Sequence, residues 1–157
     1  MIHTWCILFS TLFSFLFSYS ANFEIDAAEL NFPTQSYDNI VINGSWNNWS
    51  GWGVTLLDSD GDGIYTGTLP NISDNTIIEY VIALTGPADN WSGWGATINS
   101  PMGSSCDWKP NDEWANYGFQ VQGADVHQVY CAGTCDEVCA NGGDDGGDDG
   151  GEQNYAL

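Results

Sequence analysis

Short apolar runs, separated by Gly, Pro, Asn and Asp, recur along the chain from residue 22 to residue 130. Several of them alternate apolar and polar positions, which is the period of a strand with one buried face. This pattern predicts an all-β sandwich with strands within residues 22–30, 39–43, 54–57, 64–69, 76–84, 117–121 and 126–130. Pro70 and Pro87 fall between these strands, where a missing backbone N–H costs nothing.

The two ends of the chain differ from this pattern. Residues 7–17 are mostly apolar and are followed by Ser18, Ser20 and Ala21, which predicts a secretory signal over residues 1–20. A retained membrane anchor is the alternative, although the stretch is short for a spanning helix. Residues 141–157 begin with a Gly/Asp run that cannot bury apolar area, so we expect a disordered acidic tail or linker there. One domain remains, at residues 21–140.

The charge balance narrows the classes of partner. The chain has 21 acidic residues and one basic residue, Lys109, for a formal net charge of −20. Nucleic acid is excluded, because phosphate binding requires several Lys or Arg side chains. Acidic polysaccharides and anionic membranes are disfavoured for the same reason. Neutral glycans and divalent cations remain as partners, and we expect no membrane partner once the leader is cleaved.

The cysteines outside the leader form an even set: Cys106, Cys131, Cys135 and Cys139. In an exported chain this predicts two disulfides and a secreted, extracellular or cell-surface location. We favour a pairing of Cys106 with one of the three later cysteines. Zinc is the alternative, because His127 and those three cysteines recur at every fourth position and would align on one face of a helix.

Tryptophan is used twice in one phrase. Trp-Ser-Gly-Trp-Gly at residues 49–53 recurs at residues 91–95. With Trp46, these tryptophans lie among Gly, Ser and Asn rather than inside apolar runs. An indole face held on a turn can stack on the C–H face of a sugar ring while neighbouring amides bond its hydroxyls. The alternative is that the indoles fill the core of a structural or adhesive extracellular module, braced by disulfides and calcium.

Residues 41–50 read Val-Ile-Asn-Gly-Ser-Trp-Asn-Asn-Trp-Ser. This phrase resembles the opening of starch- and glycogen-binding modules of the CBM48/CBM20 type, such as the glycogen-binding domain of the AMP-activated protein kinase β subunit. The resemblance continues through an acidic hairpin and the strand 79–82 to a second tryptophan. It implies an Ig-like (E-set) sandwich that binds a neutral α- or β-glucan, with Trp49 and Trp91 stacking on sugar rings. It also implies that Trp46 is a core residue, and Val81 stands where the family often has a sugar-contacting Lys.

Other positions extend this hypothesis. Asn47, Asn48 and Asn116 are candidates for hydrogen bonds to sugar hydroxyls, Asn116 through a loose alignment with a family Asn. Trp52 and Trp94 either extend the binding surface or pack on each other across the repeat. We expect Trp108 and Trp114 to cover the disulfide region. The chain is also similar to small secreted E-set domains attached to bacterial glycan-degrading enzymes, which implies a tethered enzyme domain as a partner.

An acidic turn offers the one cofactor that the sequence leaves open. Asp58, Asp60 and Asp62 follow the start of a calcium loop, D-x-D-x-D-G, but Leu69 stands where a calcium loop has its bidentate Glu. A metal-free hairpin turn is the alternative. Catalysis has little support, because His127 is the single histidine after the leader and has Asp125 but no evident nucleophile nearby. We therefore expect a binding module that is not an enzyme and requires no cofactor.

Overall fold

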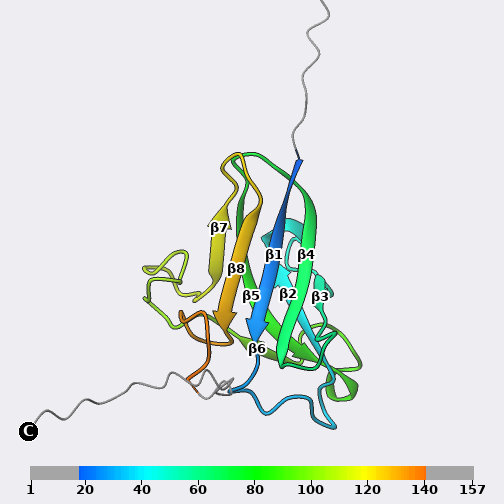
Figure 1. Cartoon of the computed structure of the whole chain (residues 1–157). Helices are drawn as coiled ribbons and strands as arrows, with labels where there is room; N and C mark the ends of the chain where they lie inside the picture. The colour runs from blue at the N-terminus through cyan, green and yellow to red at the C-terminus, as the bar shows by residue number, and fades with distance from the viewer. Residues whose placement is uncertain (1–17, 141–157) are drawn as a thin grey trace, which may run out of the picture.

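The computed structural model describes residues 18–140, in which eight strands form two β-sheets with two short 3-10 turns (Figure 1). The all-β sandwich that the alternation predicts is therefore confirmed. The predicted signal and the predicted tail fall almost entirely outside the described residues. Within residues 18–140, no helix is long and apolar enough to cross a membrane.

The smaller sheet has three strands in the order β4 (Ile64–Ser73), β1 (Ser18–Asp26) and β8 (Val126–Cys131). Central β1 runs antiparallel to β4 and parallel to β8. Its inward residues Ala21, Phe23 and Ile25 are almost fully buried, as the period-two pattern predicts. The strand begins at Ser18, slightly before the predicted end of the leader.

Pro70 corrects one expectation, because it lies inside β4 and not between strands. Two features make this tolerable. The strand is the outer member of the three-stranded sheet. The β1–β4 register also shifts where Pro70 and Asn71 together face Ser20, and Asn71 has a φ of 62°. A bulge at a sheet edge needs no ladder hydrogen bond from the proline nitrogen.

The larger sheet has the order β3 (Val54–Leu56), β2 (Asn39–Gly44), β5 (Ile77–Thr85) and β6 (Ala96–Ile98), and β7 (Tyr117–Gln120) pairs with the first half of β5. Every predicted strand is found near its expected place. The sequence pattern missed β6, which has only three residues.

The four strands β3, β2, β5 and β6 have an internal pseudo-two-fold symmetry. The 3-10 turn η1 (Ser45–Asn47) connects β2 toward β3, and η2 (Pro87–Asp89) connects β5 toward β6 in the same way. The two hairpins pair in the same register. Ile40 faces Leu56 in the β2–β3 hairpin, and the equivalent residues Ile82 and Ile98 face each other in the β5–β6 hairpin. Val41 faces Ala83, its own counterpart, in the antiparallel pairing of β2 with β5. The repeated phrase is therefore part of a repeated structural unit.

Both faces of the larger sheet are covered. Its inner face meets the smaller sheet in an aromatic core, where Tyr80 stacks on Tyr117 at 5.5 Å and packs edge-on against Phe23 at 5.1 Å. On the outer face the side chains of Asn43 and Thr85 are fully buried although they are polar. They are buried because residues 48–53 and 90–95, which we call the tryptophan loops, fold back over this face.

The cysteines close the C-terminal end of the domain. Cys106 pairs with Cys135, and Cys131 pairs with Cys139. The favoured pairing of Cys106 with the terminal group is confirmed. The zinc alternative is wrong, because residues 126–131 form a strand and not a helix, and the cysteines are bonded to one another. Asp26 at the end of β1 fixes this region by accepting a hydrogen bond from the Cys139 backbone at 2.9 Å.

Candidate functional site

The two tryptophan loops share one backbone conformation. In the first loop, Asn48 and Trp49 have φ of 56° and 58°; in the second, Asn90 and Trp91 have φ of 51° and 52°. Each loop is closed by a hydrogen bond from its first tryptophan to the glycine before the turn, Trp49 to Gly44 at 3.1 Å and Trp91 to Gly86 at 2.9 Å. A left-handed conformation is rare for a bulky side chain and persists only where the surroundings enforce it.

Buried polar side chains and glycines fix the loops to the sheet and to each other. The Asn43 amide donates to the Gly93 carbonyl at 2.5 Å and accepts from Gly53 N at 2.8 Å, so it contacts both loops. A Cβ atom at Gly53 would lie 2.0 Å from the Ile42 carbonyl oxygen, and one at Gly51 would lie 2.2 Å from the Trp94 ring nitrogen. The glycines of the phrase are therefore needed where a loop crosses the sheet edge or meets the other loop.

A groove opens beside these loops on the outer face of the larger sheet. Its volume is about 880 Å³, within the usual range of ligand sites. The strands contribute its floor through Glu79, Val81 and Thr97, and the long loop between β6 and β7 forms the opposite wall. The remaining lining residues are Ser45, Trp49, Trp94, Asn99, Met102, Lys109, Asp112, Glu113, Trp114, Ala115 and Asn116.

Three tryptophans line the groove. Trp49 and Trp94, one from each tryptophan loop, have ring centroids 6.5 Å apart and planes tilted by 44°. Trp49 is 37 % exposed, and Trp114 from the β6–β7 loop is 63 % exposed. The groove therefore offers solvent-accessible indole surface contributed by three separate segments of the chain.

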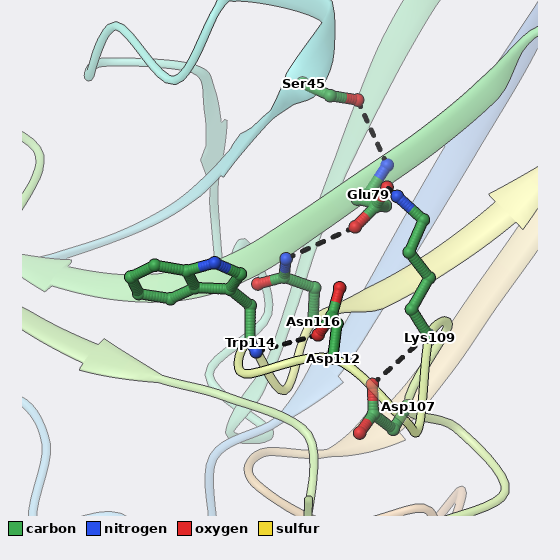
Figure 2. A network of polar contacts seen from close by, with 7 residues as sticks. All are labelled: Ser45, Glu79, Asp107, Lys109, Asp112, Trp114 and Asn116. Atoms are coloured by element: carbon green, nitrogen blue, oxygen red, sulfur yellow. Dashed lines mark hydrogen bonds and ion pairs between the residues drawn. The ribbon is translucent and has the colours of Figure 1, made fainter. Parts of the chain in front are cut away.

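A polar network occupies the floor of the groove (Figure 2). The Glu79 carboxylate pairs with the Lys109 ammonium and accepts from the Asn116 amide at 3.4 Å. Ser45 Oγ accepts from the Glu79 backbone at 3.1 Å. The hydrogen bond that Lys109 donates to Glu79 and the negative charge of that carboxylate raise the pKa of Lys109, so this ammonium stays charged. Asp112 accepts from the Trp114 backbone at 2.7 Å and holds the start of that wall.

The other predicted binding residues lie elsewhere. Trp91 is 49 % exposed but does not line the groove, and its ring nitrogen donates to Asp38 at 3.0 Å. Trp52 donates to Thr55 at 2.8 Å and is also absent from the groove. Trp94 lines the groove, and its tryptophan neighbour is Trp49 rather than Trp52.

Of the three predicted asparagines only Asn116 lines the groove, and Trp46 does not line it either. Asn116 lines the groove, whereas Asn47 donates to the Ser50 carbonyl at 2.6 Å within its own loop. Asn48 is exposed at the left-handed position of the turn. Trp46 is partly buried and packs against the hydrophobic core, as the resemblance implies.

Sequence reasoning missed the wall opposite the tryptophan loops. The sequence predicts that Trp114 covers the disulfides, but it lines the groove. The sequence pattern gives Lys109 and Glu79 no role in a site. One signal was available, because Lys109 is the single basic residue of the chain and adjoins Trp108. A lone cation in so acidic a chain is expected to have a specific carboxylate partner.

The acidic turn lies outside this groove. Asp58, Asp60 and Asp62 bring carboxylate oxygens within 4.8 Å of one another. Asp58 also accepts from Gly61 N at 2.7 Å and from Gly63 N at 3.2 Å, which closes the turn without any ion. The geometry is thus compatible with both the calcium hypothesis and the metal-free turn.

Asp125 and His127 are the residues considered for catalysis, and Asp125 has a structural role. Asp125 accepts a hydrogen bond from the Ser20 backbone at 2.8 Å, which ties the β7–β8 turn to the start of β1. His127 is exposed on β8. A scan against models of protein families gives no match for this chain, and a search of curated proteins gives none either.

Proposed function

We propose that this protein is a non-catalytic, secreted glycan-binding module of the Ig-like (E-set) type, and that it holds a neutral α- or β-glucan in the tryptophan-lined groove. The main support for this proposal is that Trp49, Trp94 and Trp114 line one open groove, with amide and charged groups at its floor. The resemblance of residues 41–50 to starch- and glycogen-binding modules supports the same class of ligand.

The chemistry of the groove suits a pyranose chain. A sugar ring presents apolar C–H faces and a rim of hydroxyls, so it needs flat apolar surface together with hydrogen-bonding groups. Trp49 and Trp114 provide exposed indole surface, and Asn116 and Asn99 provide amides in the same groove. The exposure of these indoles favours binding over a structural module whose tryptophans are internal.

Location and tethering follow from the same proposal. Two disulfides within residues 18–140 are compatible with an oxidising, extracellular compartment. The predicted Gly/Asp-rich linker would let a glycan-degrading enzyme domain act near the bound polysaccharide. In this arrangement the module supplies binding and the tethered enzyme supplies catalysis.

Binding is tested by pull-down on insoluble starch and cellulose, followed by titration calorimetry with soluble glucan oligosaccharides. Trp49→Ala and Trp114→Ala are expected to weaken binding about tenfold each, the equivalent of about 1.4 kcal/mol. Trp91→Ala is the matched control, since its indole is at least as exposed as that of Trp49 but lies outside the groove. If the Trp49 and Trp114 variants bind as well as the native protein does, the groove is not the site.

A calcium ion at the acidic turn is a separate proposal, supported by the close approach of Asp58, Asp60 and Asp62. Adding a chelator is expected to lower the melting temperature of the native protein, because a ligand bound only to the folded state stabilises it. The variant Asp60→Asn should lack that response. An identical melting temperature with excess calcium and with chelator would rule out a bound ion.

A further inference from the structure

The charged groups of the groove are not balanced. Glu79, Asp112 and Glu113 contribute three carboxylates and Lys109 one ammonium group, which gives the lining a formal net charge of −2. Lys109 is the single Lys or Arg of the whole chain. Its charge is committed to Glu79, with which it forms an ion pair. No other lysine or arginine can therefore neutralise the remaining carboxylates.

The three carboxylates are not equivalent. Glu79 lies on the floor, with its side chain only 16 % exposed, and receives both Lys109 and the Asn116 amide. Asp112 and Glu113 lie on the β6–β7 loop and are exposed. Asp112 uses one oxygen for the Trp114 backbone, so its second oxygen can meet a ligand. Figure 2 shows the Asp112 side chain beside the Trp114 backbone and Asn116, with the Trp114 indole pointing away from it; both side chains line the groove.

Exposed carboxylates and indole rings that line the same groove can together hold a glycan that carries protonated amines. A cation over an indole face is attracted by the ring quadrupole, and a carboxylate at the same place adds an ion pair. A neutral sugar can donate hydroxyl hydrogen bonds to Asp112 and Glu113 but forms no ion pair with them, and an acidic sugar is repelled by them. The net charge of −20 on the chain adds a longer-range attraction for cationic polymers.

We propose that the groove selects glycans that carry protonated amino groups, such as polymers of glucosamine, over glycans that carry only hydroxyls. This inference rests on the proposed glycan-binding groove, and it replaces the neutral glucan of that proposal with a cationic glycan as the preferred ligand. The indoles stack on the pyranose rings, and Asp112 and Glu113 contact the ammonium groups. A basic peptide would satisfy the carboxylates, but it lacks the flat rings that the tryptophan faces fit.

Three β-1,4-linked oligosaccharides of equal length test the inference by calorimetry, because they differ only in the group at C2. These are oligomers of glucose, of N-acetylglucosamine and of glucosamine. At mildly acidic pH and low salt, the glucosamine oligomer is expected to bind the native protein about tenfold more tightly than the other two. This advantage should decrease with added salt, and also at alkaline pH, where the amine is uncharged.

Matched variants distinguish the effect of the groove carboxylates from the effect of the net charge of the protein. Asp112→Asn combined with Glu113→Gln should remove the preference for the amine, so that this variant binds the glucosamine oligomer no more tightly than the glucose oligomer. Asp136→Asn combined with Glu137→Gln, an exposed pair outside the groove, changes the net charge equally and should keep the preference.

The possible failures are distinguishable. Equal affinity for the three oligomers would overturn the amine inference and leave glycan binding intact, whereas no binding of any oligomer or glucan would overturn both. If oligolysine binds as tightly as the glucosamine oligomer and Trp49→Ala affects neither, the attraction is general charge and the inference is wrong.

Discussion

The two tryptophan loops have the same sequence phrase and the same left-handed turn, yet their tryptophans have different environments. Trp49 lines the groove next to Trp94, whereas Trp91 hydrogen bonds to Asp38 outside it. The loops are related by a pseudo-two-fold axis near Val41 and Ala83. A two-fold axis places equivalent residues on opposite sides, so Trp49 of the first loop meets Trp94 of the second and not its own equivalent, Trp91.

The asymmetry comes from what surrounds each copy. The β6–β7 loop, which carries Lys109 and Trp114, forms a wall beside Trp49 only. The turns themselves differ at all three equivalent positions: Ser45 corresponds to Pro87, Trp46 to Ala88, and Asn47 to Asp89. A repeated phrase therefore determines a local backbone shape, while the neighbouring segments determine whether that shape becomes part of a site.

The glycine that ends each phrase gives the largest expected effect. In Gly53→Ala the new Cβ would lie 2.0 Å from the Ile42 carbonyl oxygen, a clash between backbone-fixed atoms, whereas in Gly95→Ala it would lie 2.8 Å from the equivalent Leu84 oxygen. We expect Gly53→Ala to cost about 3 kcal/mol of unfolding free energy and Gly95→Ala about 2 kcal/mol. Urea denaturation measures both, with exposed Ser59→Ala as the control. Native-like stability of Gly53→Ala would show that the loop does not cross the sheet edge this closely.

Trp46→Ala makes the first turn resemble the second, which has Ala88 at this place. The Trp46 ring is partly buried, packs against the core and covers Gly44 and Gly53. We expect a loss of about 2 kcal/mol, less than for a fully buried tryptophan. The comparison is Trp114→Ala, which removes a ring that is 63 % exposed and should cost less than about 0.5 kcal/mol. Equal melting temperatures for the two variants would contradict this difference.

Replacing Asp89 is expected to have the smallest effect on stability. That effect should depend on pH, which distinguishes the second turn from the first. Partial desolvation opposes its ionisation, but hydrogen bonds from Ser92, the Gly86 backbone and Thr85 hold its pKa well below the ordinary range. A lowered pKa in the folded state adds stability at neutral pH, and this is lost as pH falls below about 4, the ordinary pKa of an aspartate. Asp89→Asn should therefore lower the melting temperature at neutral pH and flatten its decrease in acid.

The control for this prediction is Asp136→Asn, which removes an exposed carboxylate of the same type. Its melting temperature should follow that of the native protein across the same pH range. If Asp89→Asn shows the native pH dependence as well, the hydrogen bonds to Asp89 contribute nothing to stability.

Strands were predictable from the sequence because one buried face imposes a period of two, as Phe23 and Ile25 show in β1. The strand β6 is missing from the prediction because Ala96–Ile98 contains a single large apolar residue, whereas the equally short β3 lies in the apolar run 54–57. Pro70 was misplaced because a bulge depends on the partner strand, which the local pattern does not contain. The pairing of Cys106 with the terminal cysteines was expected, although its partner Cys135 was not singled out.

The candidate site was only partly predictable. Trp49, Trp94 and Asn116 were named from the sequence, whereas Lys109 and Trp114 enter through a long loop whose path no periodicity reveals. The resemblance implies a common role for Trp49 and Trp91, which are equivalent positions in the repeat. Which tryptophans actually meet depends on the antiparallel pairing of β2 with β5, and this is a property of the tertiary structure.

The placement of Lys109 has a practical consequence for experiments. Because no other lysine occurs in the chain, an amine-directed reagent can modify a single side chain besides the N-terminal amine, and that side chain lies inside the groove. The rate of labelling at this one position, measured by mass spectrometry of the intact protein, would report directly on whether the groove is occupied.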